Sequence, residues 1–273
     1  MPTADRRPTG VLLLLLLFLL LPATLGAQAE ADALFRDFAP FGQLAVEIDG
    51  EPLEGAELFH AERAGAYLLI APSLKSPLLV NVRSRQVERV SFMKIRKNDG
   101  GTVDLLADAS FDTVGPFQVG AKALNFALAD GRKVTLSQKP SLLGFQTNAG
   151  MADYNPAYGY KAKEYAPKSA ALDSLRTEGR DVTVRVYFGS WCPVCGRLVP
   201  KVMALENALA GSKMQFEYYG LPQPMSDDPV AEEMGIHGVP TAVIFSGGKE
   251  IGRLGGRELY APEAAIRDAL GGA

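Results

Sequence analysis

The sequence predicts an α/β protein, with a mixed α/β domain at the C-terminus preceded by a small β-rich domain at the N-terminus. Short apolar or alternating runs, separated by turns rich in Gly, Asn and Asp, fill residues 34–138 and are typical of hairpins. After residue 169, strand-like and helix-like runs alternate instead. The length of 273 residues suits two domains. We therefore expect a signal peptide over 1–29, a β-rich domain over 30–140, a linker over 141–168 and the α/β domain over 169–273.

The N-terminus has the pattern of a secretory signal peptide. Arg6 and Arg7 precede an apolar run over 11–21, and Ala27-Gln28-Ala29 provides the small residues that signal peptidase cleaves after. The alternative is an uncleaved membrane anchor, but the apolar run is short against the ~20 residues that a spanning helix needs. We expect a periplasmic or secreted protein.

The composition limits the partners and the use of cysteine. A formal net charge of −3 at pH 7 argues against a surface for nucleic acid or anionic membranes. The chain has two cysteines, Cys192 and Cys195, in one short motif. An exported protein of this kind has no further cysteine for a structural disulfide, so the pair is predicted to serve function.

In the β-rich domain we expect seven strands and no chemistry. Asp49-Gly50 and Asp130-Gly131 are predicted hairpin turns. His60 is interpreted as a surface or strand-edge residue, because no second metal ligand lies near it in the sequence. The role of this domain stays open. The expected strands are 44–48, 66–70, 78–82, 87–95, 103–106, 124–127 and 134–137.

In the C-terminal domain the predicted elements surround the cysteine motif. The residues between the domains, with four tyrosines among glycines and prolines, are interpreted as the connection. Asp228 followed by Pro229 is expected to begin a short helix that closes at Gly235. The other expected elements are helices 169–178, 196–209 and 262–270 and strands 182–188, 214–219, 242–245 and 250–254.

The two cysteines are predicted to form a redox centre. Thiols separated by two residues can close a small disulfide ring without unfolding the domain. Cys192 is expected at a strand-to-helix turn, where unpaired N–H groups and the helix dipole stabilise a thiolate. A zinc site is the alternative, but structural zinc takes four ligands and the chain offers two cysteines and two distant histidines. We expect no metal and no cofactor.

Three motifs in the C-terminal half resemble the thioredoxin family. Trp191-Cys192-Pro193-Val194-Cys195 follows a predicted strand, as the family's active-site motif does. Pro200 is similar to the proline that kinks the family's first active-site helix, and 235–241 (Gly-Ile-His-Gly-Val-Pro-Thr) resembles its cis-proline loop. The resemblance covers roughly residues 169–273 and implies a thioredoxin-like fold for that part.

The resemblance also implies roles for individual residues. Cys192 would attack a substrate disulfide, and Cys195 would resolve the mixed disulfide that forms. Pro240 would be cis and face Cys192, with the backbone of Val239 pairing with a bound peptide. Trp191 and Pro193 would complete the substrate-binding surface; the alternative interpretation of Trp191 is a core aromatic residue.

One position departs from the family pattern. The family keeps a buried aspartate six residues before its first active-site cysteine, and this chain has Val186 there. Proton transfer from Cys195 must then use another group, and Glu217 on the next strand is a candidate. His237 either lies near the cysteines or points to solvent.

These observations predict an exported thiol–disulfide oxidoreductase with protein thiols or disulfides as substrates and an upstream redox partner. Pro193 and Val194 offer no side-chain hydrogen bond to a Cys192 thiolate, and a less stabilised thiolate favours a reductase or isomerase over an oxidase. A homodimer through the N-terminal domain would suit an isomerase by analogy. The alternative is a thioredoxin-fold binding or assembly protein whose cysteines are regulatory.

Overall fold

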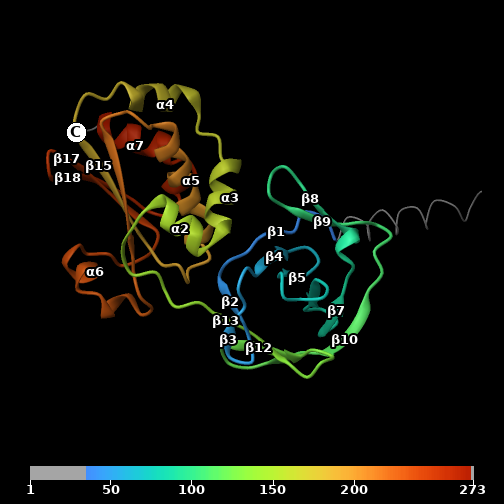
Figure 1. The fold of residues 1–273 in the computed structure, drawn as a ribbon. Helices are drawn as coiled ribbons and strands as arrows, with labels where there is room; N and C mark the ends of the chain where they lie inside the picture. Colours follow the sequence, from blue (N-terminus) through green and yellow to red (C-terminus); the bar gives the residue numbers. More distant parts are fainter. Residues whose placement is uncertain (1–34, 272–273) are drawn as a thin grey trace, which may run out of the picture.

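The computed structural model describes residues 35–271 and shows two folded domains (Figure 1). The predicted signal peptide, residues 1–29, lies outside the described residues. Within the described residues no helix combines the length and apolar character needed to cross a membrane. The predicted fold class, a mixed α/β C-terminal domain after a strand-rich N-terminal region, is confirmed.

The N-terminal domain consists of two antiparallel sheets and one extra hairpin. The first sheet has the order β1-β4-β5-β6-β7-β10, with bounds Ala39–Pro40, Glu57–Ala61, Ala66–Ile70, Leu78–Asn81, Gln86–Arg89 and Asp112–Pro116. The second has the order β11-β12-β13-β2-β3, with bounds Gln118–Val119, Ala123–Ala127, Lys133–Gln138, Leu44–Ile48 and Glu51–Pro52. The hairpin joins β8 (Ile95–Lys97) and β9 (Val103–Leu105).

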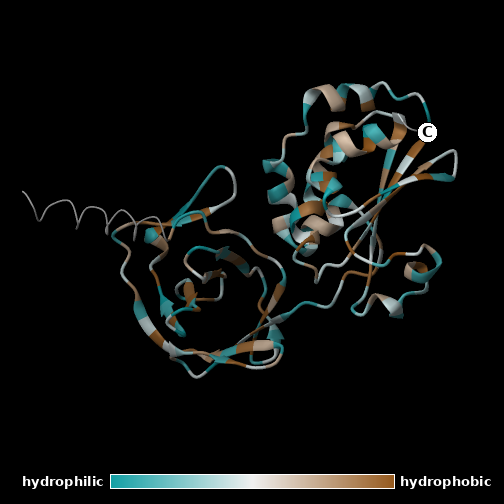
Figure 2. Cartoon of the chain, turned by 180° about the vertical axis from the view of Figure 1, so that it is seen from behind, coloured by the Kyte–Doolittle hydropathy of each residue, from teal (hydrophilic) through white to brown (hydrophobic). Residues whose placement is uncertain are grey.

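Alternating side chains give this domain its two cores. One core contains residues such as Val46, Leu69 and Val134 from both sheets, and the other contains Phe38, Leu68 and neighbouring residues. Figure 2 shows the hydrophobic residues as brown stretches on the strands of both domains. Burial of such side chains is the main stabilising contribution to a β-rich domain without disulfides.

The strands expected over 44–48 and 66–70 coincide with β2 and β5. The strand expected over 87–95 is wrong, because a 3-10 helix, η1 (Phe92–Lys94), separates β7 from β8. The Ser91 side chain accepts a hydrogen bond from Met93 N at 3.3 Å and begins this helix. A local side-chain-to-backbone bond therefore interrupts an apolar run that otherwise suits a strand.

The C-terminal domain is built on a five-stranded mixed sheet with the order β14-β16-β15-β17-β18. β15 runs parallel to β16, and the other neighbouring pairs are antiparallel. The central position of β15 places the residues that follow it at the middle of the sheet edge. The bounds are Gly144–Gln146 for β14, Val182–Phe188 for β15, Met214–Gly220 for β16, Thr241–Ser246 for β17 and Lys249–Leu254 for β18.

Helices cover the two faces of this sheet unequally. The larger core lies on one face, where α2 to α5 and α7 pack against alternate residues of β15 such as Val184 and Val186. On the other face a smaller cluster around Tyr187 packs against α6. The helices are α2 (Asn148–Tyr154), α3 (Pro156–Glu164), α4 (Ser169–Arg176), α5 (Cys195–Ala208), α6 (Pro229–Glu233) and α7 (Pro262–Gly271), with the 3-10 helices η2 (Met225–Asp227) and η3 (Glu258–Tyr260).

The linker expected over 141–168 is wrong, because this segment folds as part of the C-terminal domain. β14 pairs with the edge of β16. Met151 of α2 and Tyr158 of α3 are buried in the larger core. The polar and turn-forming residues of the segment are helix caps: Thr147 accepts from Gly150 N at 2.9 Å, and Asn155 accepts from Ala157 N at 3.0 Å. The segment therefore has the composition of a loop, because its polar residues cap two short helices.

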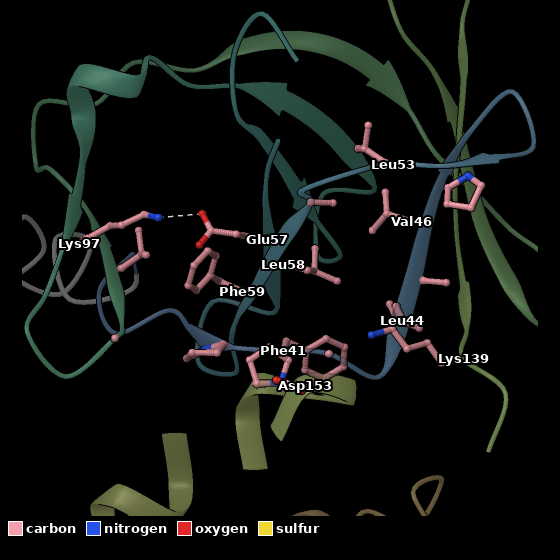
Figure 3. Close-up of a pocket in the computed structure, with 18 of the residues that line it drawn as sticks. Phe41, Leu44, Val46, Leu53, Glu57, Leu58, Phe59, Lys97, Lys139 and Asp153 are labelled. Atoms are coloured by element: carbon pink, nitrogen blue, oxygen red, sulfur yellow. Dashed lines mark hydrogen bonds and ion pairs between the residues drawn. The ribbon is translucent and has the colours of Figure 1, made fainter. Parts of the chain in front are cut away.

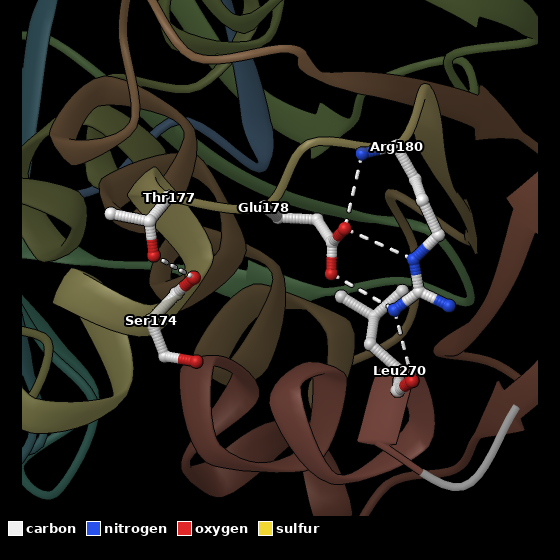
Figure 4. A network of polar contacts seen from close by, with 5 residues as sticks. All are labelled: Ser174, Thr177, Glu178, Arg180 and Leu270. Carbon is white, nitrogen blue, oxygen red and sulfur yellow. Dashed lines mark hydrogen bonds and ion pairs between the residues drawn. The ribbon is translucent and has the colours of Figure 1, made fainter.

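A polar contact network ties the loop after α4 to the end of α7 (Figure 4). The Arg180 guanidinium donates to both oxygens of Glu178, at 3.0 and 2.9 Å, and to Leu270 O at 2.9 Å. The hydrogen bond from Arg180 lowers the pKa of Glu178 from 4.5 to about 2. A charged, bidentate pair therefore joins the last helix to the start of the central strand.

We expect Arg180→Ala to unfold at a lower temperature than wild type at neutral pH, by a small margin because Arg180 is exposed. The folded-state pKa of Glu178 is depressed, so its contribution is present above pH 4.5 and is lost as pH falls towards 2. Thermal melts of both proteins between pH 7 and pH 2 measure the difference in unfolding temperature, which is expected to shrink as pH falls. A difference that stays constant across the range would contradict it.

Candidate active site

Strand β15 and helix α5 position the cysteine motif between them. β15 ends at Phe188, and the turn that follows is closed by Cys192 N donating to Gly189 O at 3.0 Å. Gly189 is required by close packing, since a Cβ there would lie 2.5 Å from the Trp191 ring. α5 begins at Cys195, and Pro200 lies inside it as expected. The motif therefore sits at a strand-to-helix turn.

The two thiols differ in accessibility. Both are free, with Cys192 7% exposed and Cys195 0% exposed. Cys195 N donates to Cys192 Sγ at 3.4 Å, and Gly189 N donates to Cys195 Sγ at 3.4 Å. Burial raises the pKa of Cys195 well above its usual range, so this residue stays a neutral thiol near pH 7. Of the two thiols, Cys192 is the one that keeps some accessible surface.

The loop before β17 lies against the accessible sulfur. The Val239–Pro240 peptide bond is cis, and Val239 O lies 3.7 Å from Cys192 Sγ. β17 neighbours β15 in the sheet, and this pairing brings residue 239 to residue 192. His237 is exposed, in agreement with the interpretation that it points to solvent.

Trp191 and Pro193 flank Cys192 on the surface. Trp191 is half-buried, and its indole Nε1 donates to Leu221 O at 3.0 Å, which fixes the ring. Pro193 is exposed. Trp191, Pro193 and Val239 thus lie near the Cys192 sulfur, although they come from two separate parts of the chain.

The suggestion that Glu217 takes a proton from Cys195 is wrong. Glu217 Oε2 accepts from Arg185 Nε at 2.6 Å, and the Arg185 guanidinium lies 5.2 Å from the Phe145 ring centroid. Arg185 and Val186 are successive strand residues, so their side chains point to opposite faces of the sheet. Val186 faces the core that contains Cys195, and Glu217 therefore lies on the other side.

Two residues near the cysteines come from the segment expected to be a linker. Tyr158 of α3 is buried in the same core cluster as Cys192 and Cys195. Burial raises the pKa of the Tyr158 phenol, and negative charge on Cys195 raises it further. Lys161 Nζ donates to Gly196 O at 3.0 Å, and burial lowers the pKa of this lysine. The signal that the sequence offers for this contribution is the tyrosine-rich run, because buried tyrosines pack in cores.

Comparisons with known proteins show what the C-terminal part of the chain is similar to. The thioredoxin family model matches residues 170–268. Thioredoxin-2 of Saccharomyces cerevisiae is 30% identical over 104 residues, which cover 38% of this chain and 91% of that protein. A thioredoxin of Malassezia sympodialis is 29% identical over 90 residues, 33% of this chain and 83% of the relative. A crystal structure of Malassezia sympodialis thioredoxin matches with 29% identity and a TM-score of 0.28, covering 34% of this chain and 79% of that one. The chain belongs, through its C-terminal domain, to the thioredoxin family.

Proposed function

We propose that this protein is an exported thiol–disulfide oxidoreductase that exchanges disulfides with protein substrates through Cys192 and Cys195. The observation that carries the proposal is the difference in burial of the two thiols, 7% against 0% exposed, at the start of α5. A partly exposed nucleophile with a shielded second thiol three residues later is the arrangement that sequential exchange needs.

In the proposed reaction the Cys192 thiolate attacks one sulfur of a substrate disulfide. The substrate S–S bond breaks, a Cys192–substrate disulfide forms, and the other substrate sulfur leaves as a thiolate that takes up a proton. Cys195 then loses its proton and attacks Cys192 Sγ, which releases the second substrate thiol. The substrate gains two electrons and two protons, and the enzyme ends with a Cys192–Cys195 disulfide. An upstream dithiol partner restores the enzyme.

The proposed direction is reduction or isomerisation. In the described part of the chain, Cys195 N is the backbone donor to Cys192 Sγ; Pro193 has no N–H and Val194 no polar side chain. A sparsely stabilised thiolate gives up electrons more readily than a strongly stabilised one. The reduction potential of the pair tests this, with a value near −270 mV favouring a reductase and one near −120 mV an oxidant.

An insulin-reduction assay tests the proposed activity. We expect the reduced protein to precipitate insulin chains in the presence of dithiothreitol and the Cys192→Ser variant to match the uncatalysed rate, because it lacks the nucleophile. Cysteine-independent activity, or none in the wild type, would favour a thioredoxin-fold binding or assembly protein instead.

Export and assembly are parts of the same proposal. The residues that support export are Arg6, Arg7 and the apolar run over 11–21. Cell fractionation with N-terminal sequencing of the purified protein tests export and cleavage. A homodimer through the β-rich domain is tested by light scattering.

A further inference from the structure

The N-terminal domain reaches the cysteine motif through the loop after β1. Gln43 in this loop lines a cavity of about 260 Å³ with Ser190 and Trp191 on one side of the motif. It also lines a cavity of about 290 Å³ with Gly196 on the other side. A Cβ at Gly196 would lie 3.6 Å from Gln43 Nε2. Gln43 of the β-rich domain therefore lies beside the residues on both sides of the two cysteines.

Close packing holds this loop in place. Gly42 is buried, and a Cβ there would lie 2.7 Å from Asn155 Cα and Pro156 Cδ, so the chain passes directly against the start of α3. β1 lies beside α3 (Figure 1). Lys139 Nζ donates to Tyr154 O at 2.8 Å. The junction thus contains direct contacts between the two domains.

The walls of the 260 Å³ cavity combine aromatic rings with amides. Phe41 and Tyr67 of the β-rich domain have ring centroids 5.3 Å apart and face the cavity together with Trp191. Gln43 and Gln138 line the same cavity. Aromatic surfaces accept apolar side chains, and amide groups can pair with peptide N–H and C=O groups. The ammonium of Lys139, also in the wall, is already bonded to Tyr154 O.

A larger apolar cavity of about 550 Å³ lies behind this wall, mostly within the β-rich domain, with Asp153 and Pro156 of the C-terminal domain also in its lining (Figure 3). It shares Phe41, Leu44 and Lys139 with the 260 Å³ cavity. Leu53 and Leu58 line its interior, and the Lys97–Glu57 ion pair lies at one side. Apolar surface therefore continues from the redox turn into the N-terminal domain.

We propose that the β-rich domain forms one wall of the substrate site. The 260 Å³ cavity is then a groove, with Phe41, Gln43, Tyr67 and Trp191 in its walls, that binds an extended polypeptide with an apolar side chain next to the target disulfide. This inference rests on the proposed function, because the groove is lined by Ser190 and Trp191, which directly precede Cys192 in the chain. It assigns the N-terminal domain the role of selecting polypeptide substrates. Small disulfides, which reach Cys192 without filling the groove, do not use this wall.

The test compares a protein and a small disulfide on the same variants. Phe41→Ala removes the aromatic wall, and Gln43→Trp fills the groove without removing a core side chain. Phe92→Ala is the matched control, because Phe92 is 49% exposed in the same domain and lines none of these three cavities. Each full-length protein is assayed for kcat/KM with insulin and with hydroxyethyl disulfide, and its thermal unfolding is recorded.

We expect the ratio of the two kcat/KM values, insulin over hydroxyethyl disulfide, to fall about tenfold in Phe41→Ala and Gln43→Trp. The ratio in Phe92→Ala is expected to equal that of wild type. A wild-type ratio in folded Gln43→Trp would overturn the inference and leave the proposed function intact. Lack of cysteine-dependent turnover of both substrates by the wild-type protein would instead overturn the proposed function.

Discussion

The Cys195→Ser variant is expected to accumulate a covalent adduct with a protein disulfide, whereas the wild type releases both products. Cys192 keeps its small accessible surface and attacks the substrate, but no second thiol lies behind it to break the mixed disulfide. Release then depends on external thiol, and we expect turnover to fall on the order of 10³-fold or more. Non-reducing electrophoresis and mass spectrometry detect the adduct, and the insulin-reduction assay measures the fall in turnover.

The matched control for this experiment is Cys192→Ser. Its remaining thiol, Cys195, is fully buried, and burial raises its pKa, so it is expected to form no adduct at neutral pH. Equal adduct yields from the two variants would show that the thiols are equivalent and would contradict the assigned order of attack.

Phe188→Ala is expected to destabilise the C-terminal domain by about 3–5 kcal/mol. Phe188 is 0% exposed at the end of β15, with its ring centroid 6.4 Å from that of Tyr158 in an edge-on arrangement. Its removal leaves a cavity in the core that also contains Cys195. Because whole domains are stable by only about 5–15 kcal/mol, chemical denaturation will show a large shift in midpoint.

Phe145→Ala provides the comparison within the same domain. Phe145 lies on β14 and is 60% exposed, although its ring contacts that of Tyr219 with centroids 5.0 Å apart. We expect a loss of about 1 kcal/mol or less. A loss as large as that of Phe188→Ala would mean that burial does not decide the stability of this sheet.

The elements of the C-terminal domain were predictable because local patterns and tertiary contacts agree there. β15 has the predicted bounds, and Asp228 caps α6 by accepting from Val230 N at 2.9 Å. The segment over 141–168 was not predictable in the same way. Its helices are only seven and nine residues long, and their stability comes from Met151 and Tyr158 in the core rather than from a local helical pattern.

The candidate site also has features that local sequence patterns predict and features that only tertiary contacts decide. The short spacing of the two cysteines predicted the redox pair, and the resemblance to the thioredoxin family implied roles for Trp191, Pro193 and the Val239–Pro240 loop. It could not reveal which face of the sheet Glu217 occupies, and the structure places it with Arg185 on the face away from the cysteines.

The sequence by itself therefore determined the candidate redox pair and its family, since it places two cysteines before a predicted helix in a thioredoxin-family domain. Only the tertiary structure decided the surroundings of that pair. The burial of Cys195, the approach of Tyr158 and the position of Gln43 beside the motif depend on how elements from distant parts of the chain pack together. Such contacts leave no pattern within a single helix or strand, because the sequence of each element also has to support its own secondary structure and core packing.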